Sequence, residues 1–339
     1  MGYNLRSRTD RGVKILEAKV YLFNAKGNDE QLDINDVRLD KIKENQLLWI
    51  NVLGRDKEFI EKITEALELK NVPVKSILNV LERPRIDIYE NFYRFFIVSV
   101  KTTENGQLKK IPIDFMVGKN YVITIHDEEV EYFKNYTELE KGETHIGELD
   151  AESFIAALLD LHLVTYFCVL EQIEEKVDWL DAKVLQTDIE TNEFLAEMVK
   201  LRKTVSYLRR WFLPHREVFY ALSRPDFQQV AQSDSAESFR LLTEHFENAF
   251  EAIESSRDTL LGLFDLYATK SAQTTNDLVK RLTLITLIVG LLGVIAGTFG
   301  MNFEVNEIFK AENGFWITVV VMLILASGLI VFAKLKRLI

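Results

Sequence analysis

The sequence predicts an α/β domain followed by long helices and two transmembrane helices. Three observations predict this fold class. Strand-like and helix-like segments alternate up to residue 127, the pattern is wholly helical from Asp150 onwards, and two uncharged segments near the end are long enough to cross a bilayer. Hydrophobic residues make up 47% of the 339 residues, which is ordinary for a soluble protein, so we expect the membrane character to be confined to these two segments.

Composition excludes several classes of protein. A net charge of −11 argues against nucleic acid as the main partner, because phosphate binding needs a concentrated basic surface. The single cysteine, Cys168, excludes an internal disulfide, and we expect it to be a buried structural thiol. Residues 1–11 are polar and basic without an apolar core, so we expect no signal peptide.

Catalytic and cofactor-binding patterns are missing from the sequence. No phosphate-binding loop, dinucleotide fingerprint or G-x-S-x-G elbow is present. The histidines are scattered, without paired zinc-ligand spacing. We therefore expect neither an enzyme nor a cofactor. The five scattered histidines are His126, His145, His162, His215 and His245.

The first 149 residues are expected to form the α/β domain with a mixed sheet. The predicted strands are rich in β-branched and aromatic residues. They cover residues 18–23, 47–52, 92–100, 111–117 and 121–126, and Asn105-Gly106 marks a hairpin turn between two of them. Residues 56–69 are predicted to form an amphipathic helix with one apolar side, made of Phe59, Ile60, Ile63, Ala66 and Leu67.

Residues 151–185 and 191–222 are predicted to form two long amphipathic helices. The first carries an acidic face, which is typical of a solvated surface. That face consists of Glu171, Glu174, Glu175, Asp178 and Asp181.

A continuous helix is expected over residues 235–300, because the chain has no proline after Pro225. Its apolar residues keep near-heptad spacing, and no single subunit is expected to bury so long a seam, so symmetric association is predicted. The spacing alone does not count subunits. The seam consists of Phe239, Leu242, Phe246, Phe250, Ile253, Leu260, Phe264, Tyr267 and Leu278.

The first predicted span, residues 282–301, has no ionisable side chain but carries a stripe of small and polar residues. Such a stripe either packs against a neighbouring helix or faces water. For its threonines, a hydrogen bond to the preceding helical turn is the alternative to lining a pore, and the register favours the pore. The stripe consists of Asn276, Thr283, Thr286, Gly290, Gly293, Gly297 and Gly300.

Charges around the spans predict the topology. Lys280 and Arg281 precede the first span, and three basic residues follow the second, so the positive-inside rule places both termini in the cytoplasm. The loop between the spans is acidic, with Glu304, Glu307 and Glu312. We expect an α/β domain at 1–149, long helices at 150–225, a stalk at 226–281, a first span at 282–301, an outer loop at 302–314, a second span at 315–333 and a basic tail at 334–339.

Gly300-Met301-Asn302 closes the first span and is followed by a short loop and the second span. With Thr275-Asn276 upstream, this arrangement resembles the CorA family of divalent-cation channels, whose signature is Gly-Met-Asn at the outer end of the first of two membrane helices. The resemblance extends over essentially the whole chain. In the cytosolic part it rests on residues 48–54, 77–80 with 83–85, 89–92 and 119–124.

The resemblance implies a funnel-shaped homopentamer in a bacterial or archaeal inner membrane, with the first span lining a pore and the second outside it. It implies Mg²⁺ as the expected ion, with Co²⁺ and Ni²⁺ as further cargo, and an external metal site at Gly300, Met301 and Asn302. It also leaves open that the acidic helix face helps to concentrate cations.

A path without ionisable side chains must select ions with neutral oxygens, and Asn302 offers a side-chain carbonyl at the outer mouth. Hydrated Mg²⁺ can bind such oxygens through its water shell, and the loop glutamates can attract cations. A divalent ion falling through ~100 mV gains roughly 4.6 kcal/mol, so membrane potential suffices to drive transport.

Three departures from the family pattern keep alternatives open. Gly290-Leu291 stands where magnesium channels of the family usually carry Met-Pro as a constriction, so Val279, Leu282 and Leu287 are the candidate hydrophobic gate. The acidic positions that bind regulatory magnesium fall on Ser76 and Leu241, with Asp87 and Glu244 nearby.

The outer loop also lacks the Met-Pro-Glu-Leu that commonly follows the signature in the family. It reads Phe303-Glu-Val-Asn-Glu-Ile-Phe309 instead, although Phe303-Glu304 itself leans towards the magnesium branch. A zinc transporter of the ZntB type is therefore the first alternative. A membrane-anchored structural oligomer that conducts nothing is the second.

Overall fold

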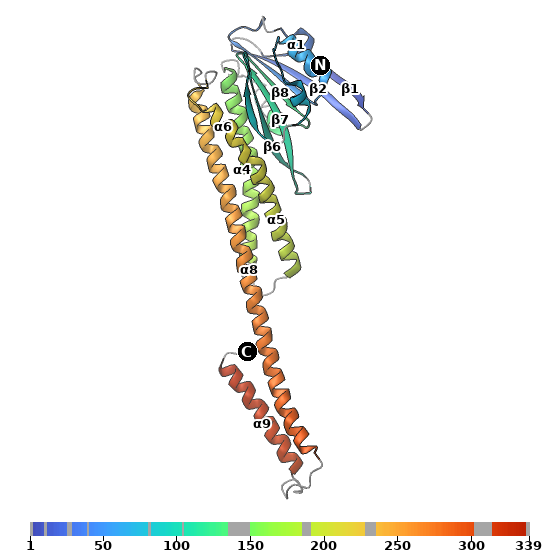
Figure 1. Ribbon diagram of the computed structural model, residues 1–339, viewed down its shortest axis with the longest axis vertical. Coiled ribbons are helices and arrows are strands. Elements are labelled where there is room, and N and C mark those ends of the chain that lie inside the picture. Colours follow the sequence, from blue (N-terminus) through green and yellow to red (C-terminus); the bar gives the residue numbers. More distant parts are fainter. Residues whose placement is uncertain are drawn as a thin grey trace. The chain divides into compact units, whose positions relative to one another are not determined.

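The computed structural model of the chain describes residues 3–9, 12–25, 29–38, 41–80, 83–103, 105–134, 150–184, 191–227, 235–301 and 314–336. The chain divides into two compact units, Met1–Leu260 and Leu261–Ile339 (Figure 1).

An eight-stranded mixed sheet organises the described part of the first unit. Its strands are ordered β1-β2-β4-β8-β7-β6-β5, with β3 paired to β2. Only β4 and β8 pair in parallel, so the predicted mixed sheet is confirmed. The strands are β1 (Tyr3–Thr9), β2 (Gly12–Asn24), β3 (Glu30–Leu32), β4 (Gln46–Leu53), β5 (Arg85–Ile88), β6 (Tyr93–Thr102), β7 (Leu108–Gly118) and β8 (Tyr121–His126).

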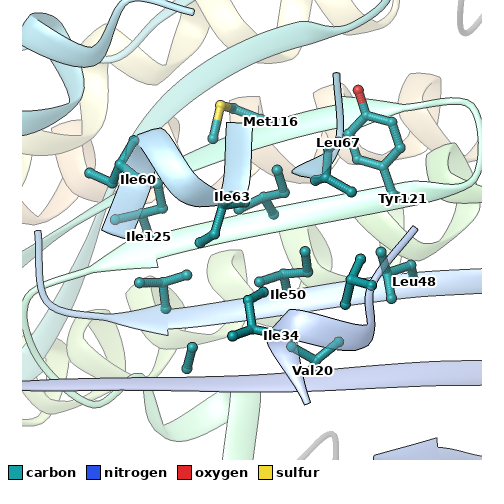
Figure 2. Packing of buried hydrophobic residues seen from close by; sticks show 14 of the residues in the cluster. Val20, Ile34, Leu48, Ile50, Ile60, Ile63, Leu67, Met116, Tyr121 and Ile125 are labelled. Atoms are coloured by element: carbon teal, nitrogen blue, oxygen red, sulfur yellow. The ribbon is translucent and has the colours of Figure 1, made fainter. Parts of the chain in front are cut away.

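The central strands are covered on both faces. Alternate residues of β4 and β8, such as Ile50 and Ile125, point into an apolar cluster beneath helix α1 (Lys57–Ala66), as Figure 2 shows. The residues between them point the other way, where Trp49 Nε1 donates to Thr124 Oγ1 at 3.1 Å and the Trp49 ring lies 5.3 Å from that of Phe154 in helix α4 (Ala151–Val184). Burial on both faces explains the almost continuously apolar sequence of these strands.

Helix α1 is shorter than the predicted helix over 56–69. Asp56 caps its first turn by accepting a hydrogen bond from the Phe59 N–H at 3.1 Å. The helix ends at Ala66 because the following turn places Glu68 and Asn71 at positive φ. Ala66 is exposed, so its predicted place on the apolar side is wrong, whereas Phe59, Ile60, Ile63 and Leu67 are buried as predicted.

The predicted hairpin turn at Asn105-Gly106 is confirmed. Strands β6 and β7 pair up to Thr102 and Leu108, and Gly106 takes a φ of 69°, which favours glycine. The Thr103 N–H donates to the Gln107 carbonyl at 2.8 Å and closes the turn.

A second hairpin, between β7 and β8, makes a stability prediction. A Cβ atom on Gly118 would lie 2.2 Å from the ring of Tyr121, which is buried and cannot easily move. We expect Gly118→Ala to cost about 1–3 kcal/mol by overpacking. Unfolding of the purified protein checks this, and in a Tyr121→Leu background the same substitution should cost much less. An equal cost in both backgrounds would contradict the steric explanation.

The remaining helices largely follow the prediction. Proline at position 214 interrupts the helix predicted over 191–222, because it cannot continue the hydrogen-bond ladder, and a short 3₁₀ turn, η4, takes its place. Two short elements, η1 (Ile34–Asp36) and α2 (Val74–Leu78), were not predicted. The others are α5 (Thr191–Phe212), η4 (Leu213–His215), α6 (Arg216–Leu222), α8 (Ala236–Phe299) and α9 (Gly314–Leu335).

By length and composition, three described helices could cross a membrane: α4, α8 and α9. The expectation that only two segments have this character is therefore wrong. In α4, however, 56% of the apolar window is buried inside the protein, where the helix packs on β6, β7 and β8, whereas none is buried in α8 or α9. Helix α4 is thus a core helix whose apolar length serves the sheet.

Part of the predicted seam is buried within one chain, which corrects the expectation that no single subunit could bury it. The Phe246 ring lies 4.6 Å from that of Phe212 and 5.1 Å from that of Phe219, because α5 and α6 run beside this part of α8. Leu278, further along, is exposed. The residues of the seam that are buried are Phe239, Leu242, Phe246, Ile253 and Leu260.

The outer surface of α4 gives one confirmation and one correction. The five residues of the acidic face, from Glu171 to Asp181, are exposed, which confirms the predicted face and agrees both with a solvated surface and with a face that concentrates cations. Cys168 is also exposed, so the expectation of a buried thiol is wrong.

Candidate functional site

The candidate site is one face of α8 within the second unit. By helical spacing, the predicted stripe lies opposite the residues that the rest of this unit covers. Leu284, Ile288, Leu292 and Ile295 are half-buried, and each lies two positions from a stripe residue, or about 200° around the helix. Helix α9 is the only other described element of the unit and has a half-buried face of its own, so we infer that α9 covers these four residues.

The glycines of the stripe are open. A Cβ atom added to Gly290, Gly293 or Gly297 would meet nothing within 4 Å, and one on Gly300 would meet only its own helix, with the Ala296 carbonyl at 3.4 Å. These glycines therefore do not serve close packing against α9, which was one of the two interpretations of the stripe. Among the described residues of the second unit, nothing packs on these glycines, so the face is available to water or to another copy.

The threonines of the stripe form the hydrogen bonds that were the alternative to a pore role. Thr283 Oγ1 donates to the Val279 carbonyl at 2.8 Å, and Thr286 Oγ1 donates to the Leu282 carbonyl at 2.9 Å. Because the hydroxyl protons are used within the helix, each oxygen faces outwards only as an acceptor. An acceptor can receive hydrogen bonds from the water shell of a cation, so the back-bond and the pore role are compatible.

A shallow groove follows this face. The predicted stripe residues Thr283, Thr286 and Gly290 line it together with Leu282 and Leu287 of the candidate gate, and Leu291 and Val294 complete its wall. The other predicted residues, Asn276 and Val279, are exposed one to two turns earlier on α8. The groove is therefore apolar, with acceptor oxygens at intervals.

The helix tightens at its end. The Gly300 N–H is shared between the carbonyls of Ala296 at 3.0 Å and Gly297 at 3.2 Å, and the Met301 N–H donates to Thr298 at 3.4 Å. A helix C-terminus carries unpaired carbonyls and the negative end of the helix dipole, which favours a cation. Met301 is exposed there, while Asn302 and the loop residues Glu304, Glu307 and Glu312 lie outside the described residues.

Sequence reasoning missed a buried ion network in the first unit. Asp114, on β7, accepts hydrogen bonds from the guanidinium groups of Arg55 and Arg94 through its two carboxylate oxygens. Arg94 Nη1 also lies 3.4 Å from Ser76 Oγ and 3.3 Å from Asp87 Oδ2. No sequence signal indicates these pairs, because the partners are up to 59 residues apart.

This network bears on the positions considered for regulatory magnesium. Ser76 already contacts a guanidinium, and Asp87 is ion-paired with both Arg94 and Arg85, the latter at 3.1 Å. Glu244 and Leu241 are exposed on α8. Among the residues that the structure describes, no three His, Cys, Asp or Glu side chains are placed together to hold a metal.

Two of the scattered histidines meet in the core, although their spacing in the sequence gave no sign of it. The rings of His162 and His215 lie 5.1 Å apart, and both side chains are fully buried. They are 53 residues apart in the sequence because the rest of α4 and the whole of α5 lie between them.

The sequence of this chain is similar to a known family of transport proteins. The family described as a CorA-like Mg²⁺ transporter protein matches residues 44–337. The cobalt/magnesium transport protein CorA of Thermotoga maritima is 28% identical over 298 residues, which cover 85% of this chain and 82% of that protein.

Solved structures share the fold. The complete CorA magnesium transporter of Methanocaldococcus jannaschii matches with a TM-score of 0.78 at 19% identity, over 94% of this chain and 97% of that one. The ZntB cytoplasmic domain of Vibrio parahaemolyticus matches with a TM-score of 0.60 at 12% identity, over 75% of this chain and 98% of that one. Since the family match spans residues 44–337 of 339, the chain belongs to the CorA-like Mg²⁺ transporter protein family.

Proposed function

We propose that this chain forms a homo-oligomeric channel that passes divalent cations, above all Mg²⁺, along the uncharged stripe of α8. The observation that carries the proposal is the orientation of that stripe. It lies opposite the half-buried face that we assign to contact with α9, and a Cβ atom added to Gly290, Gly293 or Gly297 would meet nothing within 4 Å. Copies of the chain arranged in a ring would turn this face towards a shared axis.

The proposed assembly is a pentamer in the inner membrane, as the family resemblance implies. Residues 282–301, at the end of α8 and just beyond it, would line the pore, and residues 315–333 would form the outer ring of helices. The loop 302–314, with its glutamates, would lie outside, and the α/β domain at 1–149, the helices at 150–225, the stalk at 226–281 and the tail at 334–339 would lie in the cytoplasm. Both basic flanks would then be inside.

The proposed selectivity rests on hydrated ions. Magnesium sheds its water reluctantly, so a path lined by acceptors is better suited to holding the water shell than to replacing it. Rings of Thr283, Thr286 and Asn276 would accept hydrogen bonds from that shell, and Asn302 would do so first, at the outer mouth. Hydrated Co²⁺ and Ni²⁺ carry the same charge and would follow the same path, driven by the membrane potential.

The proposed gate is hydrophobic. Leu282 and Leu287 border the groove and Val279 is exposed one turn earlier, so rings of these side chains would close a narrow path by excluding water. No catalytic residue is proposed, because the family to which the chain belongs is one of transporters.

Ion flux into liposomes tests the proposal. The purified protein should admit Mg²⁺, Co²⁺ and Ni²⁺ under an inside-negative potential. Zinc uptake that depends on pH, without magnesium uptake, would replace the proposal with a ZntB-type function. If none of the four ions enters the liposomes, the remaining interpretation is a structural oligomer that conducts nothing.

Replacing Asn302 with alanine should weaken the outer site. Each subunit would lose one hydrogen bond to the hydrated ion, and a bond to a charged group is worth about 1.5–3 kcal/mol, so half-maximal flux should need at least roughly tenfold more Mg²⁺. Concentration-dependent flux measures this. Asn306→Ala, the same change four residues along the loop, is the matched control. Equal behaviour of the two variants would refute the role of Asn302.

A further inference from the structure

Two side chains from the helical part of the first unit hold the backbone of Val98 in β6. Strand β5 pairs with β6 only as far as Arg85 and Phe96, so beyond that point β6 has no strand neighbour on this side among the described residues. There the Val98 N–H donates to His215 Nε2 at 2.9 Å, and the Val98 carbonyl accepts from Tyr166 Oη at 2.6 Å. The side chains of His215, from η4, and Tyr166, from α4, thus take the place of a missing strand.

The bond from Val98 fixes the protonation state of His215. His215 Nδ1 lies 2.9 Å from the Phe212 carbonyl, which can only accept, so Nδ1 carries the proton. The other nitrogen, Nε2, must then be unprotonated in order to accept from Val98. A second proton on the ring would set two donors against each other and remove the bond.

The surroundings offer no compensation for such a proton. The titratable groups that face His215 are His162 and Tyr166 from α4, and Tyr132 lies behind His162 with ring centroids 6.5 Å apart. Neither ring nitrogen of His162 has a hydrogen-bond partner among the described residues. No carboxylate among the described residues shifts the pKa of His162 or His215.

We propose that the hydrogen bond between His215 and Val98 is an acid-sensitive latch, which ties η4 and its flanking helices to the sheet and opens as the pH falls. The latch is connected through α6 to the N-terminal part of α8, around Phe246 and Glu247. Phe219 of α6 stacks on Phe246 at 5.1 Å, and Arg216 Nη2 pairs with Glu247 Oε2 at 2.7 Å. Release of η4 would therefore loosen the support that α6 gives to α8.

The direction of the pH effect follows from burial. Burial lowers the pKa of His215 to about 4, although the hydrogen bond from its Nδ1 to the Phe212 carbonyl acts in the opposite direction, and burial also lowers the pKa of His162 well below its usual value. A histidine in the opened, hydrated state titrates near 6.5. The closed state is therefore favoured above pH 6.5 and loses this advantage as the pH falls towards 4.

The size of the effect follows from the same two values. From His215 alone, the ratio of open to closed latch should be roughly thirtyfold higher at pH 5 than at pH 7.5. A second histidine, His162, adds to this in the same direction.

Hydrogen–deuterium exchange of the full-length protein in detergent tests the latch. After correction for intrinsic exchange, the Val98 amide, resolved by overlapping peptides within residues 93–102, should lose roughly thirtyfold in protection between pH 7.5 and pH 5. The amides of β6 that are bonded to β7, and peptides from α1 on the other face of the sheet, should not follow. Unchanged protection of the Val98 amide, or an equal loss in α1, would overturn the proposal.

Variants separate the latch from other titrations. His215→Gln keeps an acceptor for Val98 but does not titrate, so most of the pH dependence should disappear. The control is His245→Gln, which removes an exposed histidine paired with Asp160 and should leave the dependence intact. If His215→Gln does not fold, His162→Phe should still reduce the loss of protection at pH 5. A loss of pH dependence in His245→Gln would also contradict the assignment.

Discussion

Replacing Gly290 with phenylalanine is expected to abolish divalent-cation flux without harming the fold of the chain. Gly290 lines the groove on α8, and a Cβ atom there would meet nothing within 4 Å. Phenylalanine is also a better helix former than glycine, so α8 itself should not weaken. If the stripe faces the axis of a ring of subunits, each subunit would place one phenyl ring at the level of residue 290. These phenyl rings would fill the path and exclude water from it.

The measurement is Mg²⁺ flux into liposomes, together with the assembly state in detergent. A size series sharpens it, because Gly290→Ala narrows the path less and should reduce flux less than phenylalanine does. Ile285→Phe is the matched control, since Ile285 is exposed five residues earlier, about 140° away around the helix. Normal flux in Gly290→Phe, or equal loss in both phenylalanine variants, would show that the stripe does not line the path.

The face of α8 was accessible to sequence reasoning because a helix repeats every 3.6 residues, so the spacing of Thr283, Thr286 and Gly290 defines one side without knowledge of the fold. Which side α9 covers was not accessible, since that depends on contacts between segments. Contacts between segments also decide how the apolar seam of α8 is buried, so the sequence could not predict this. The spacing of the seam predicted burial, but only the structure shows that Phe246 is covered by Phe212 and Phe219 of the same chain.

Local signals also decided which strands were predicted. The apolar runs of β4, β6 and β8 and the Asn105-Gly106 turn are strong signals, and the structure confirms them. Strand β5 has only four residues, Arg85–Ile88, directly after a proline, and its ends are exposed. Its place is set by pairing with β6, which no local pattern reveals.

The second large effect is expected from Asp114→Asn in the buried ion network. Asp114, Arg55 and Arg94 have side chains that are only 1–2% exposed, and each carboxylate oxygen of Asp114 faces one guanidinium. The amide would keep the shape but remove the charge that the two arginines share. Breaking a buried pair in this way typically costs 3–5 kcal/mol, because a buried charge loses its partner, so we expect a loss of about that size.

The remaining partners cannot fully compensate. Arg55 keeps Asp127 at 3.1 Å and the Ile77 carbonyl at 2.7 Å, and Arg94 keeps Asp87 at 3.3 Å, but the side chains of Asp127 and Asp87 are 33% and 29% exposed. Arg55 binds Ile77 and Arg94 binds Ser76, both in helix α2, and Arg94 also pairs with Asp87 of strand β5. We therefore expect α2 and β5 to lose protection from hydrogen exchange first.

Thermal or denaturant unfolding of the full-length protein measures the loss, with hydrogen exchange locating it. Glu44→Gln is the control, because its pair with Lys119 is 3.6 Å long and both side chains are largely exposed. Such a surface pair is worth about 0–1 kcal/mol. If Asp114→Asn unfolds at the same midpoint as Glu44→Gln, the buried network does not stabilise the sheet. The two arginines would then have found water or other partners in place of the carboxylate.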